Sequence, residues 1–320
     1  MTAQFLRKVS LIVGNASGQG LDLSELHIRF TIWSATTQSP KHTTIRVYNV
    51  ADATAKRLQQ EFQQVFLQAG YGDNVGQIFS GAIKQIRKGR ENATDTFIDI
   101  IAADGDEAYN WSVVNTTLAA GWSQTDYHGA LIQSMSPYGV TAGYVPQFAS
   151  TQLPRGKVCY GMTRDYMRQL AGASGTQWTV QDGRLHMIPV NGVMPGQSIV
   201  ITSATGMVGI PTQTVDGILV KCLLNPNIIP GGRIQIDNAS VQQIQFDVSY
   251  GAVSNFYDPT SANKNTGLDA DGFYKVYAMT QTGDTRGPAF YTDMICAAVN
   301  GTQPLTSTYT NAVVNGQQGG

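Results

Sequence analysis

The chain has 320 residues, of which 42% are hydrophobic and 34 are glycine, a composition typical of a turn-rich β protein with room for two or three domains. Charged residues make up only 13%, well below the globular average of about 25%. Lys and Arg (21) nearly balance Asp and Glu (22), and the net charge of −1 excludes a strongly basic nucleic-acid footprint at the level of the whole chain.

The cysteines and the termini indicate the compartment. Cys159, Cys222 and Cys296 are odd in number, far apart and without a CxxC pair, so we expect buried thiols rather than disulfides. The N-terminus lacks the apolar run of a signal peptide, and no window reaches the ~18 apolar residues of a membrane span. We therefore expect a soluble protein that folds in a reducing cytoplasm and has no stable membrane association.

Residues 1–104 predict a small antiparallel barrel with one helix packed against it. Apolar and polar residues alternate over 25–32, which indicates a half-buried strand. The stretch GNASGQG over 14–20 has neither GxGxxG nor Walker spacing, so we interpret it as a hairpin loop. The strands are expected at 6–13, 26–32, 44–48, 77–88 and 96–102.

The helix of this first region is expected between the third and fourth strands. Asp52 can cap its start, the helix runs to about Gln68, and Gly70 ends it. Its predicted apolar face is formed by Leu58, Phe62, Val65 and Phe66, which are spaced i, i+4, i+7 and i+8.

Residues 105–190 change character and predict a smaller α+β region. Two short helices are expected, at 126–136 and 163–170. Asp182-Gly183 stands between two short apolar runs, at 178–180 and 185–190. Asp-Gly in that position is the strongest local hairpin signal, because a type I′ turn requires positive φ angles.

Residues 191–300 predict a return to strands. A buried strand over 218–224 ends at Asn225-Pro226, a turn follows at 230–232, and a short strand follows at 233–237. Another turn at Asp271-Gly272 opens a strand in which Phe273, Lys275 and Tyr277 alternate with Tyr274 and Val276. A polar turn over 283–287 closes the segment, and the Gly-rich residues 301–320 are expected to form a flexible tail.

Three of these segments carry a resemblance to a known family. They are RGKVCYGMTRDYMRQLAGASGTQWTVQDGRLHMIPV, MVGIPTQTVDGILVKCLLNPNIIPGG and DGFYKVYAMTQTGDTRG, taken together with the N-terminal barrel pattern. With them, the chain resembles the tail hub family, the baseplate or tail-tip hubs of tailed phages, which is related in outline to the hubs of contractile injection systems. The resemblance covers residues 1 to about 298.

The resemblance implies a mainly β fold with short helices. Two tube-like antiparallel β-barrel domains, at 1–104 and 191–300, would flank a smaller α+β domain at 105–190, although no residue-level repeat is visible in the sequence. Family members form trimers in which each chain supplies two similar barrels. Three chains then make a pseudo-six-fold ring that joins the hexameric tail tube to the trimeric spike and forms part of the DNA channel.

The resemblance also implies partners and structural residues. The partners would be two further copies of the chain, the tail tube protein, a spike or tip protein and a tape measure protein, with DNA only in transit and the assembled product in the virion tail. Asp284 and Arg286 allow two interpretations, an ion pair across a turn or a loop held rigid at a barrel rim. The residues expected to maintain the fold are Leu223, Asn225, Pro226, Gly231, Gly272, Tyr274, Val276, Asp284, Thr285, Arg286 and Gly287.

The sequence indicates no catalytic, cofactor or metal site. The four histidines lack metal-ligand spacing. Asp126, His128 and Ser134 contain the elements of a nucleophilic triad but fall on one short helix, which cannot hold them in the required geometry. Glu107 is the only glutamate that fits a sugar-binding cleft, which leaves a tail-associated glycan hydrolase or glycan-binding module as an alternative. The hub of a bacterial contractile injection system is a further alternative.

Overall fold

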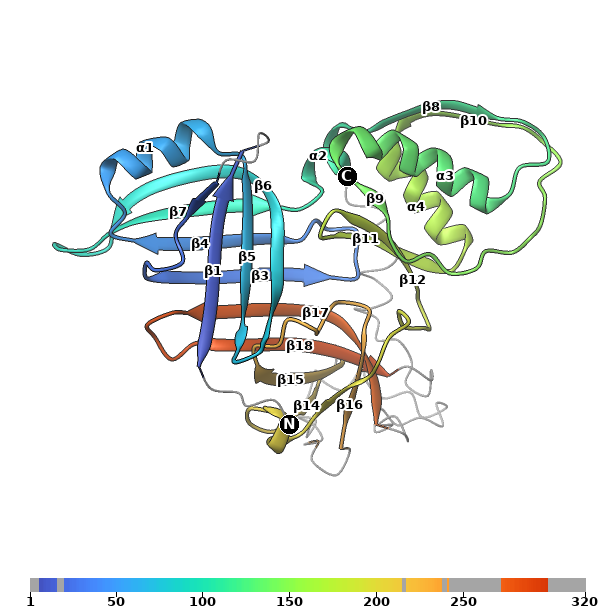
Figure 1. Cartoon of the computed structure of the whole chain (residues 1–320). Coiled ribbons are helices and arrows are strands. Elements are labelled where there is room, and N and C mark those ends of the chain that lie inside the picture. The colour runs from blue at the N-terminus through green and yellow to red at the C-terminus, as the bar shows by residue number, and fades with distance from the viewer. Residues whose placement is uncertain (1–5, 16–19, 215–216, 238–240, 242–271, 299–320) are drawn as a thin grey trace, which may run out of the picture.

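The computed structural model describes residues 6–15, 20–214, 217–237, 241 and 272–298. The described part consists mainly of β-strands with a few short helices, which confirms the expected mainly β class. In Figure 1 the first strands and helix α1 lie beside a lobe that carries the other α-helices, and the last strands lie below the first ones. No helix in the described ranges is long and apolar enough to cross a membrane.

The first strand set, β1 to β7, follows the predicted pattern closely. Alternation along β3 buries Ile28, Phe30 and Ile32 and exposes the residues between them to different degrees, as a half-buried strand requires. The elements are β1 (Arg7–Gly14), β2 (Gly20–Asp22), β3 (Ile28–Ala35), β4 (His42–Tyr48), α1 (Asp52–Glu61), β5 (Gln64–Tyr71), β6 (Asn74–Arg90) and β7 (Thr96–Ala103).

The predicted helix was too long at its C-terminal end. It ends at Glu61, Phe62 is already extended, and a strand that the sequence analysis missed follows as β5. Val65 is fully buried while Phe66 is 40% exposed, so these neighbours face opposite sides of a sheet. Gly70 lies inside this strand and does not end a helix. The apolar spacing fitted both periods, and pairing with β1 and β6 decides in favour of the strand.

The start of α1 also differs from the prediction. The N-cap position is Ala51, which provides no side-chain capping bond, and Asp52 is the first helical residue. The Asp52 carboxylate instead pairs with Lys88 on β6. An acidic residue in the first turn still matches the helix dipole.

The middle region contains the two predicted helices and the predicted hairpin. Asp182 and Gly183 have φ angles of 51° and 72°, the left-handed values that a type I′ turn needs. The elements are α2 (Asp106–Trp111), β8 (Val113–Leu118), α3 (Gln124–Met135), the 3-10 turn η1 (Ser136–Tyr138), β9 (Thr141–Ala142), β10 (Lys157–Met162), α4 (Thr163–Ala173), β11 (Thr176–Gln181) and β12 (Arg184–Pro189).

The second strand set, β13 to β18, contains the strands predicted around 218–224 and from 273 onward. The first of them is buried on one face only, because Leu219 is 43% exposed. The predicted turn residue Asp271 and the tail over 301–320 lie outside the described residues. The elements are β13 (Ile199–Ile201), the 3-10 turn η2 (Ser203–Thr205), β14 (Thr212–Thr214), β15 (Gly217–Leu223), β16 (Arg233–Ile236), β17 (Phe273–Asp284) and β18 (Phe290–Ala298).

The two strand sets belong to one 13-stranded sheet within the described residues, because β17 pairs with β3. Each set follows the same path. The order is β3-β4-β7-β6-β5-β1 in the first set and β14-β15-β18-β17-β16-β13 in the second, and the strands correspond one to one in chain order. The two paths differ in their final pair of strands. Strand β5 pairs with β1 in an antiparallel direction, whereas β16 pairs with β13 in a parallel direction.

A β-bulge appears at the corresponding place in each set. The pairing of β6 with β7 shifts between Ile83 and Gln85, and that of β17 with β18 shifts between Val276 and Ala278. Bulges are specific local features of a strand, so a shared bulge supports a structural repeat that the sequence did not reveal.

Three hydrophobic clusters correspond to the two strand sets and the middle region. The first is formed mainly by residues between 11 and 102, the second by residues between 108 and 187, and the third by residues between 201 and 296. Leu224 and Phe290 come from the second strand set but are buried in the first cluster. The two sets are therefore joined through their cores as well as through their strand edges.

Candidate assembly interface

The junction between the strand sets is an antiparallel pairing of β17 with β3. It extends from Ala278 opposite Ala35 to Asp284 opposite Arg29. The last pair joins residues 255 positions apart in the chain. The junction is thus a long-range contact between two units that share a strand order.

Asp284 anchors one end of this junction. Its carboxylate accepts hydrogen bonds from Arg29 Nε (2.7 Å) and from the backbone N–H groups of Arg286 (2.9 Å) and Gly287 (2.8 Å), and it lies 2.8 Å from His27 Nε2. Burial alone would raise the pKa of Asp284, but these hydrogen bonds outweigh it and lower the pKa to about 2. The carboxylate therefore stays ionised at neutral pH.

The turn after Asp284 is fixed to the first strand set. Thr285 exchanges two hydrogen bonds with Ile28, from its backbone N–H to the Ile28 carbonyl and from the Ile28 N–H to its hydroxyl, both 3.0 Å. Arg7 donates to the carbonyl oxygens of Gly287 (2.6 Å) and Pro288 (2.9 Å). Arg29 is thus the side-chain ion partner of Asp284, and Arg286 contributes its backbone N–H to the carboxylate.

A second contact comes from the segment after β15. Asn74 Nδ2 donates to Asn225 Oδ1 (3.2 Å), and Pro226 packs against Gly76, where an added β-carbon would lie 3.0 Å from the proline Cβ. Leu223 is half-buried against the first cluster. These three predicted residues, Leu223, Asn225 and Pro226, therefore lie against the first strand set.

The remaining predicted residues shape the second strand set itself. Tyr274 and Val276 are fully buried in its core. Gly231 has a φ of 83° and donates its N–H to the Val276 carbonyl at 2.7 Å, which closes the predicted turn onto β17. Gly272 also takes a left-handed φ, 71°, immediately before β17.

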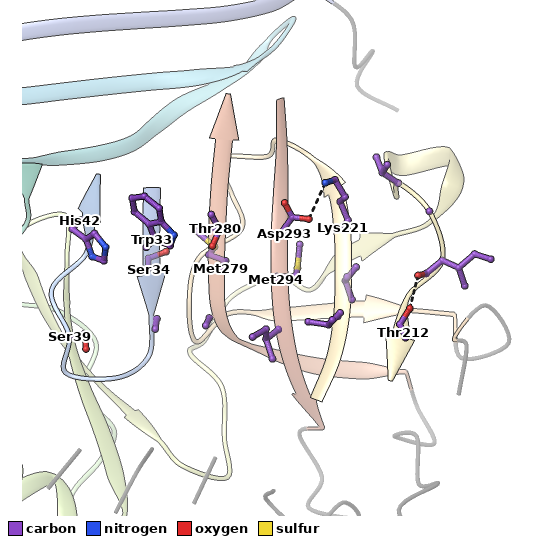
Figure 2. Close-up of a pocket in the computed structure, with 18 of the residues that line it drawn as sticks. Trp33, Ser34, Ser39, His42, Thr212, Lys221, Met279, Thr280, Asp293 and Met294 are labelled. Carbon is purple, nitrogen blue, oxygen red and sulfur yellow. Dashed lines mark hydrogen bonds and ion pairs between the residues drawn. The ribbon is translucent and has the colours of Figure 1, made fainter. Parts of the chain in front are cut away.

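A cross-strand ion pair recurs at the corresponding position of the two sets. Arg46 on β4 lies opposite Asp99 on β7, and Lys221 on β15 lies opposite Asp293 on β18. The Asp99 side chain is fully buried and also binds Arg87 (2.7 Å), whereas the Lys221–Asp293 pair (3.3 Å) is exposed (Figure 2). Burial raises the pKa of Asp99, but hydrogen bonds from Arg46 and Arg87 prevail and lower it.

Two buried ionisable groups that the sequence analysis missed hold the ends of the middle region. Lys275, which the predicted alternation grouped with Phe273 and Tyr277, is 2% exposed and donates to the Pro189 carbonyl at 2.8 Å. Burial lowers its pKa to about 8. At the other end, Asp104 accepts the Gly183 N–H (3.1 Å), and burial together with the nearby Asp182 raises its pKa to about 6. Strand alternation predicted neither, because packing of the middle region against the sheet buries both.

An apolar trough of about 640 Å³ lies over the junction. It crosses β3, β17, β18 and β15, and Figure 2 shows its lining side chains. One wall is Trp33 stacked on His42, with ring centroids 5.0 Å apart, and the other includes the exposed side chains of Ile210 and Leu219. The volume would accept apolar side chains or a small ligand, and polar side chains such as Thr280, Lys221 and Asp293 lie among the apolar ones on its strands.

The candidate catalytic residues are not arranged for catalysis in the described part of the chain. Asp126 forms a capping box with Ser123 at the start of α3, and His128 is buried with no hydrogen-bond partner at Nε2. Ser134 donates to the Leu131 carbonyl within its own helix. Glu107 is 59% exposed and lies 3.7 Å from Lys84. None of the described residues forms a cluster suited to a metal ion.

Sequence comparisons do not assign the chain to a family. No protein-family model matches it, and no curated protein matches its sequence. The fold, by contrast, is shared with solved structures.

Three solved structures share the fold over nearly the whole chain. The 43 kDa tail protein of prophage MuSo2 from Shewanella oneidensis has a TM-score of 0.57 and 7% identity, covering 92% of this chain and 99% of that protein. The tail protein from Neisseria meningitidis MC58 has a TM-score of 0.54 and 10% identity, covering 94% and 99%.

The third comes from a secretion system. The E. coli c3393 protein, described as a type VI secretion component with structural similarity to the T4 bacteriophage tail proteins gp27 and gp5, has a TM-score of 0.52 and 9% identity, covering 94% and 80%. The resemblance expected from the sequence is thus supported at the level of the fold. The chain has the fold of phage tail proteins and of a component of the type VI secretion system.

Proposed function

We propose that the chain is a structural hub of a phage tail tip or baseplate. Three copies form a pseudo-six-fold ring in which each chain supplies two tube-like barrels, residues 1–104 and 191–300, and the α+β region 105–190 lies between them in sequence. The ring joins a six-fold tail tube to a three-fold spike or tip. No catalytic step and no cofactor are part of this role.

The observation that carries the proposal is the repeated strand order joined edge to edge by β17 and β3. Two similar units in one chain present six similar units in a trimer, which matches the six equivalent docking surfaces of a six-fold tube. The ion pairs Arg46–Asp99 and Lys221–Asp293 at matching positions support the same duplication. The similarity of the fold to two solved tail proteins supports a role in a tail.

The proposed partners follow from the position of such a ring. They are two further copies of the chain, the tail tube protein on one side, a spike or tip protein on the other, and a tape measure protein within the channel. DNA passes through the ring without a specific binding site. The near-balance of 21 basic and 22 acidic residues suits passage, because each Lys or Arg contact to phosphate adds to binding.

A second candidate is the hub of a bacterial contractile injection system. The similarity to the E. coli type VI secretion component favours it. Both candidates use the same ring, so they differ in the neighbouring genes and in the identity of the spike rather than in the chemistry of this chain.

The test of the proposed ring is the mass of the purified protein. Light scattering should give three times 34.5 kDa at high concentration or after addition of the tube or spike protein. A protein that stays at 34.5 kDa with every partner would contradict the hub role. Turnover of purified peptidoglycan, abolished by Glu107→Gln, would instead support a glycan hydrolase.

A further inference from the structure

Three ionisable side chains meet where the middle region packs against the first strand set. Lys41 precedes β4, Asp104 follows β7, and Asp182 lies in the turn between β11 and β12. The Lys41 Nζ lies 3.0 Å from Asp182 Oδ1. The Asp104 N–H donates to the Lys41 carbonyl at 2.8 Å, and the Asp104 carboxylate accepts the Gly183 N–H at 3.1 Å. Each of the three segments is therefore held to both of the others.

The amine of Lys41 is largely withdrawn from water. The Lys41 side chain is 8% exposed, and its Nζ lies 5.9 Å from the ring centroid of Phe79, which is fully buried. The other described lysines that pair with carboxylates are Lys84, Lys88 and Lys221, and their side chains are 31%, 44% and 43% exposed. Lys41 therefore has far less freedom than these lysines to move away from its partner.

A second carboxyl group, that of Asp104, lies beside the Lys41–Asp182 pair. Asp104 is 4% exposed. Burial together with the Asp182 charge raises the pKa of Asp104 to about 6, although the Lys41 charge acts in the opposite direction. Two carboxyl groups thus share one ammonium group, and a carboxyl group with a pKa near neutrality can both take up and release a proton.

We propose that Lys41 and Asp182 become joined by an intramolecular isopeptide bond, with Asp104 as the proton carrier. Asp104 takes one proton from the ammonium group, and the Nζ lone pair then attacks Cγ of Asp182. A C–N bond forms and one C–O bond breaks. Two of the three ammonium protons pass to the departing oxygen, which leaves as water. Asp104 ends in the protonation state in which it began, and no oxidant, reductant or cofactor takes part.

The geometry favours this reaction over the ordinary ion pair of a surface lysine. An amine and a carboxyl group held in contact react far faster than the same groups free in solution, because their encounter has already been arranged by folding. The Asp182 side chain is 34% exposed, so the water that forms has a path to solvent. The buried Lys41 supplies the fixed nucleophile, and the partly exposed Asp182 supplies the leaving oxygen.

The bond has a consequence that the ion pair lacks. It joins positions 141 residues apart and remains intact when the chain unfolds. A covalent link of this kind restrains the unfolded chain as a disulfide does, but it needs no oxidising compartment. It ties the middle region to the first strand set, and it does so whether or not the chain forms a ring.

Mass spectrometry of the purified full chain tests the bond. The folded chain should be lighter than its sequence mass of 34.5 kDa by one water molecule. Lys41→Arg keeps a cation beside Asp182 but should have the full mass, because a guanidinium group stays charged and does not attack. Lys88→Arg alters the exposed pair with Asp52 and should still lose the water. Full mass in an unmodified chain that is folded by circular dichroism would overturn the proposal.

A tryptic digest locates the bond. The linked chain should yield one branched peptide made of residues 30–46 and 169–184, uncut after Lys41. Asp182 precedes Gly183, so its carboxyl group could lose the same water by cyclising onto the Gly183 nitrogen, which would give a lighter but linear peptide. The branched peptide supports the proposal, and a lighter linear peptide would overturn it.

The role of Asp104 requires a variant that keeps its structural contact. Asp104→Asn retains a side-chain oxygen that can accept the Gly183 N–H, but it cannot carry a proton. This variant should fold with an unchanged circular dichroism spectrum and keep the full mass, and Asp104→Glu, which restores a carboxyl group, should recover part of the water loss. A folded Asp104→Asn chain that loses water as completely as the unmodified chain would show that the carboxyl group is only structural.

The outcomes are independent of the hub proposal. A trimer that has the full mass per chain and gives no branched peptide would leave the hub proposal standing and reject the bond. A linked chain that never assembles, alone or with a tube or spike protein, would support the bond and reject the hub.

Discussion

The two strand sets share one strand order but differ in which of their described edges are paired. In the second set, the edge of β17 pairs with β3. At the end of this pairing, Asp284 on β17 forms an ion pair with Arg29 on β3. In the first set, the matching edge of β6 has no partner strand among the described residues of the single chain. The comparison teaches that two units with the same strand order can differ in whether an equivalent edge is paired within the described part of the chain.

The two sets also differ in the interactions that stabilise each of them internally. The first set has helix α1 packed on its core, and it has a fully buried Asp99 that two arginines share. Among the described residues, the second set has no helix between the corresponding strands β15 and β16, and its matching carboxylate, Asp293, is 48% exposed. We infer that the first set is the more stable scaffold, and the following predictions test that difference.

The largest effect is expected at the end of α1, a feature without a described counterpart in the second set. Phe62 is 6% exposed in the first core, so Phe62→Asp should lower the free energy of unfolding by more than about 3 kcal/mol, because it removes a large apolar side chain and buries a charge. Its neighbour Gln63 is exposed, and Gln63→Asp should be nearly silent. Urea unfolding measures both, and equal tolerance would mean that Phe62 does not pack in the core.

The matching ion pairs permit a direct comparison of burial. Asp99→Ala leaves Arg46 and Arg87 without their buried acceptor and should cost about 3 kcal/mol. Asp293→Ala removes an exposed partner of Lys221 and should cost less than about 1 kcal/mol. Thermal or urea unfolding of the two variants gives the difference. Equal costs would show that the two positions are not distinguished by burial.

A smaller, pH-dependent effect is expected at Lys275, where the first set has Ala82. The pKa of Lys275 is about 8 in the folded protein, against 10.5 for an unperturbed lysine, so folding disfavours its charged form. Below pH 8, the buried ammonium group lowers the free energy of unfolding by its full amount. As the pH rises from 8 to 10, loss of the proton should raise the free energy of unfolding by about 2 kcal/mol.

The measurement is the stability of the unmodified chain minus that of Lys275→Met, followed across this range of pH. The difference removes the titration of all other groups from the comparison. A difference that does not change with pH would show that Lys275 is hydrated in solution.

The sequence predicted the features that depend on local pattern. Alternation identified the strand that starts at Ile28, and Asp182-Gly183 identified a hairpin turn, because both signals lie within a few residues of one another. The helix boundary near Phe62 was wrong because the spacing of its apolar residues fits a helix and a strand equally well. Only the partners β1 and β6 decide between them.

The junction could be predicted only in part. Asp284 was identified as a residue with a specific polar role, yet its partners Arg29 and His27 are more than 250 positions away and leave no local signal. The repeat was also hidden, because it is preserved in strand order, bulge position and one ion pair rather than in residue identity. The burial of Lys275 was not predicted, because alternation along one strand cannot show which of its faces a second layer covers.

The distance along the chain between β3 and β17 also determines when their pairing can form during synthesis. Arg29 and Asp284 are 255 positions apart, and ribosomes add roughly 5 to 20 residues each second. About 10 to 50 seconds therefore pass after β3 is made before its partner strand exists. During that interval, the edge of β3 that will bind β17 has no partner strand. The junction therefore forms only after nearly the whole described chain has been made.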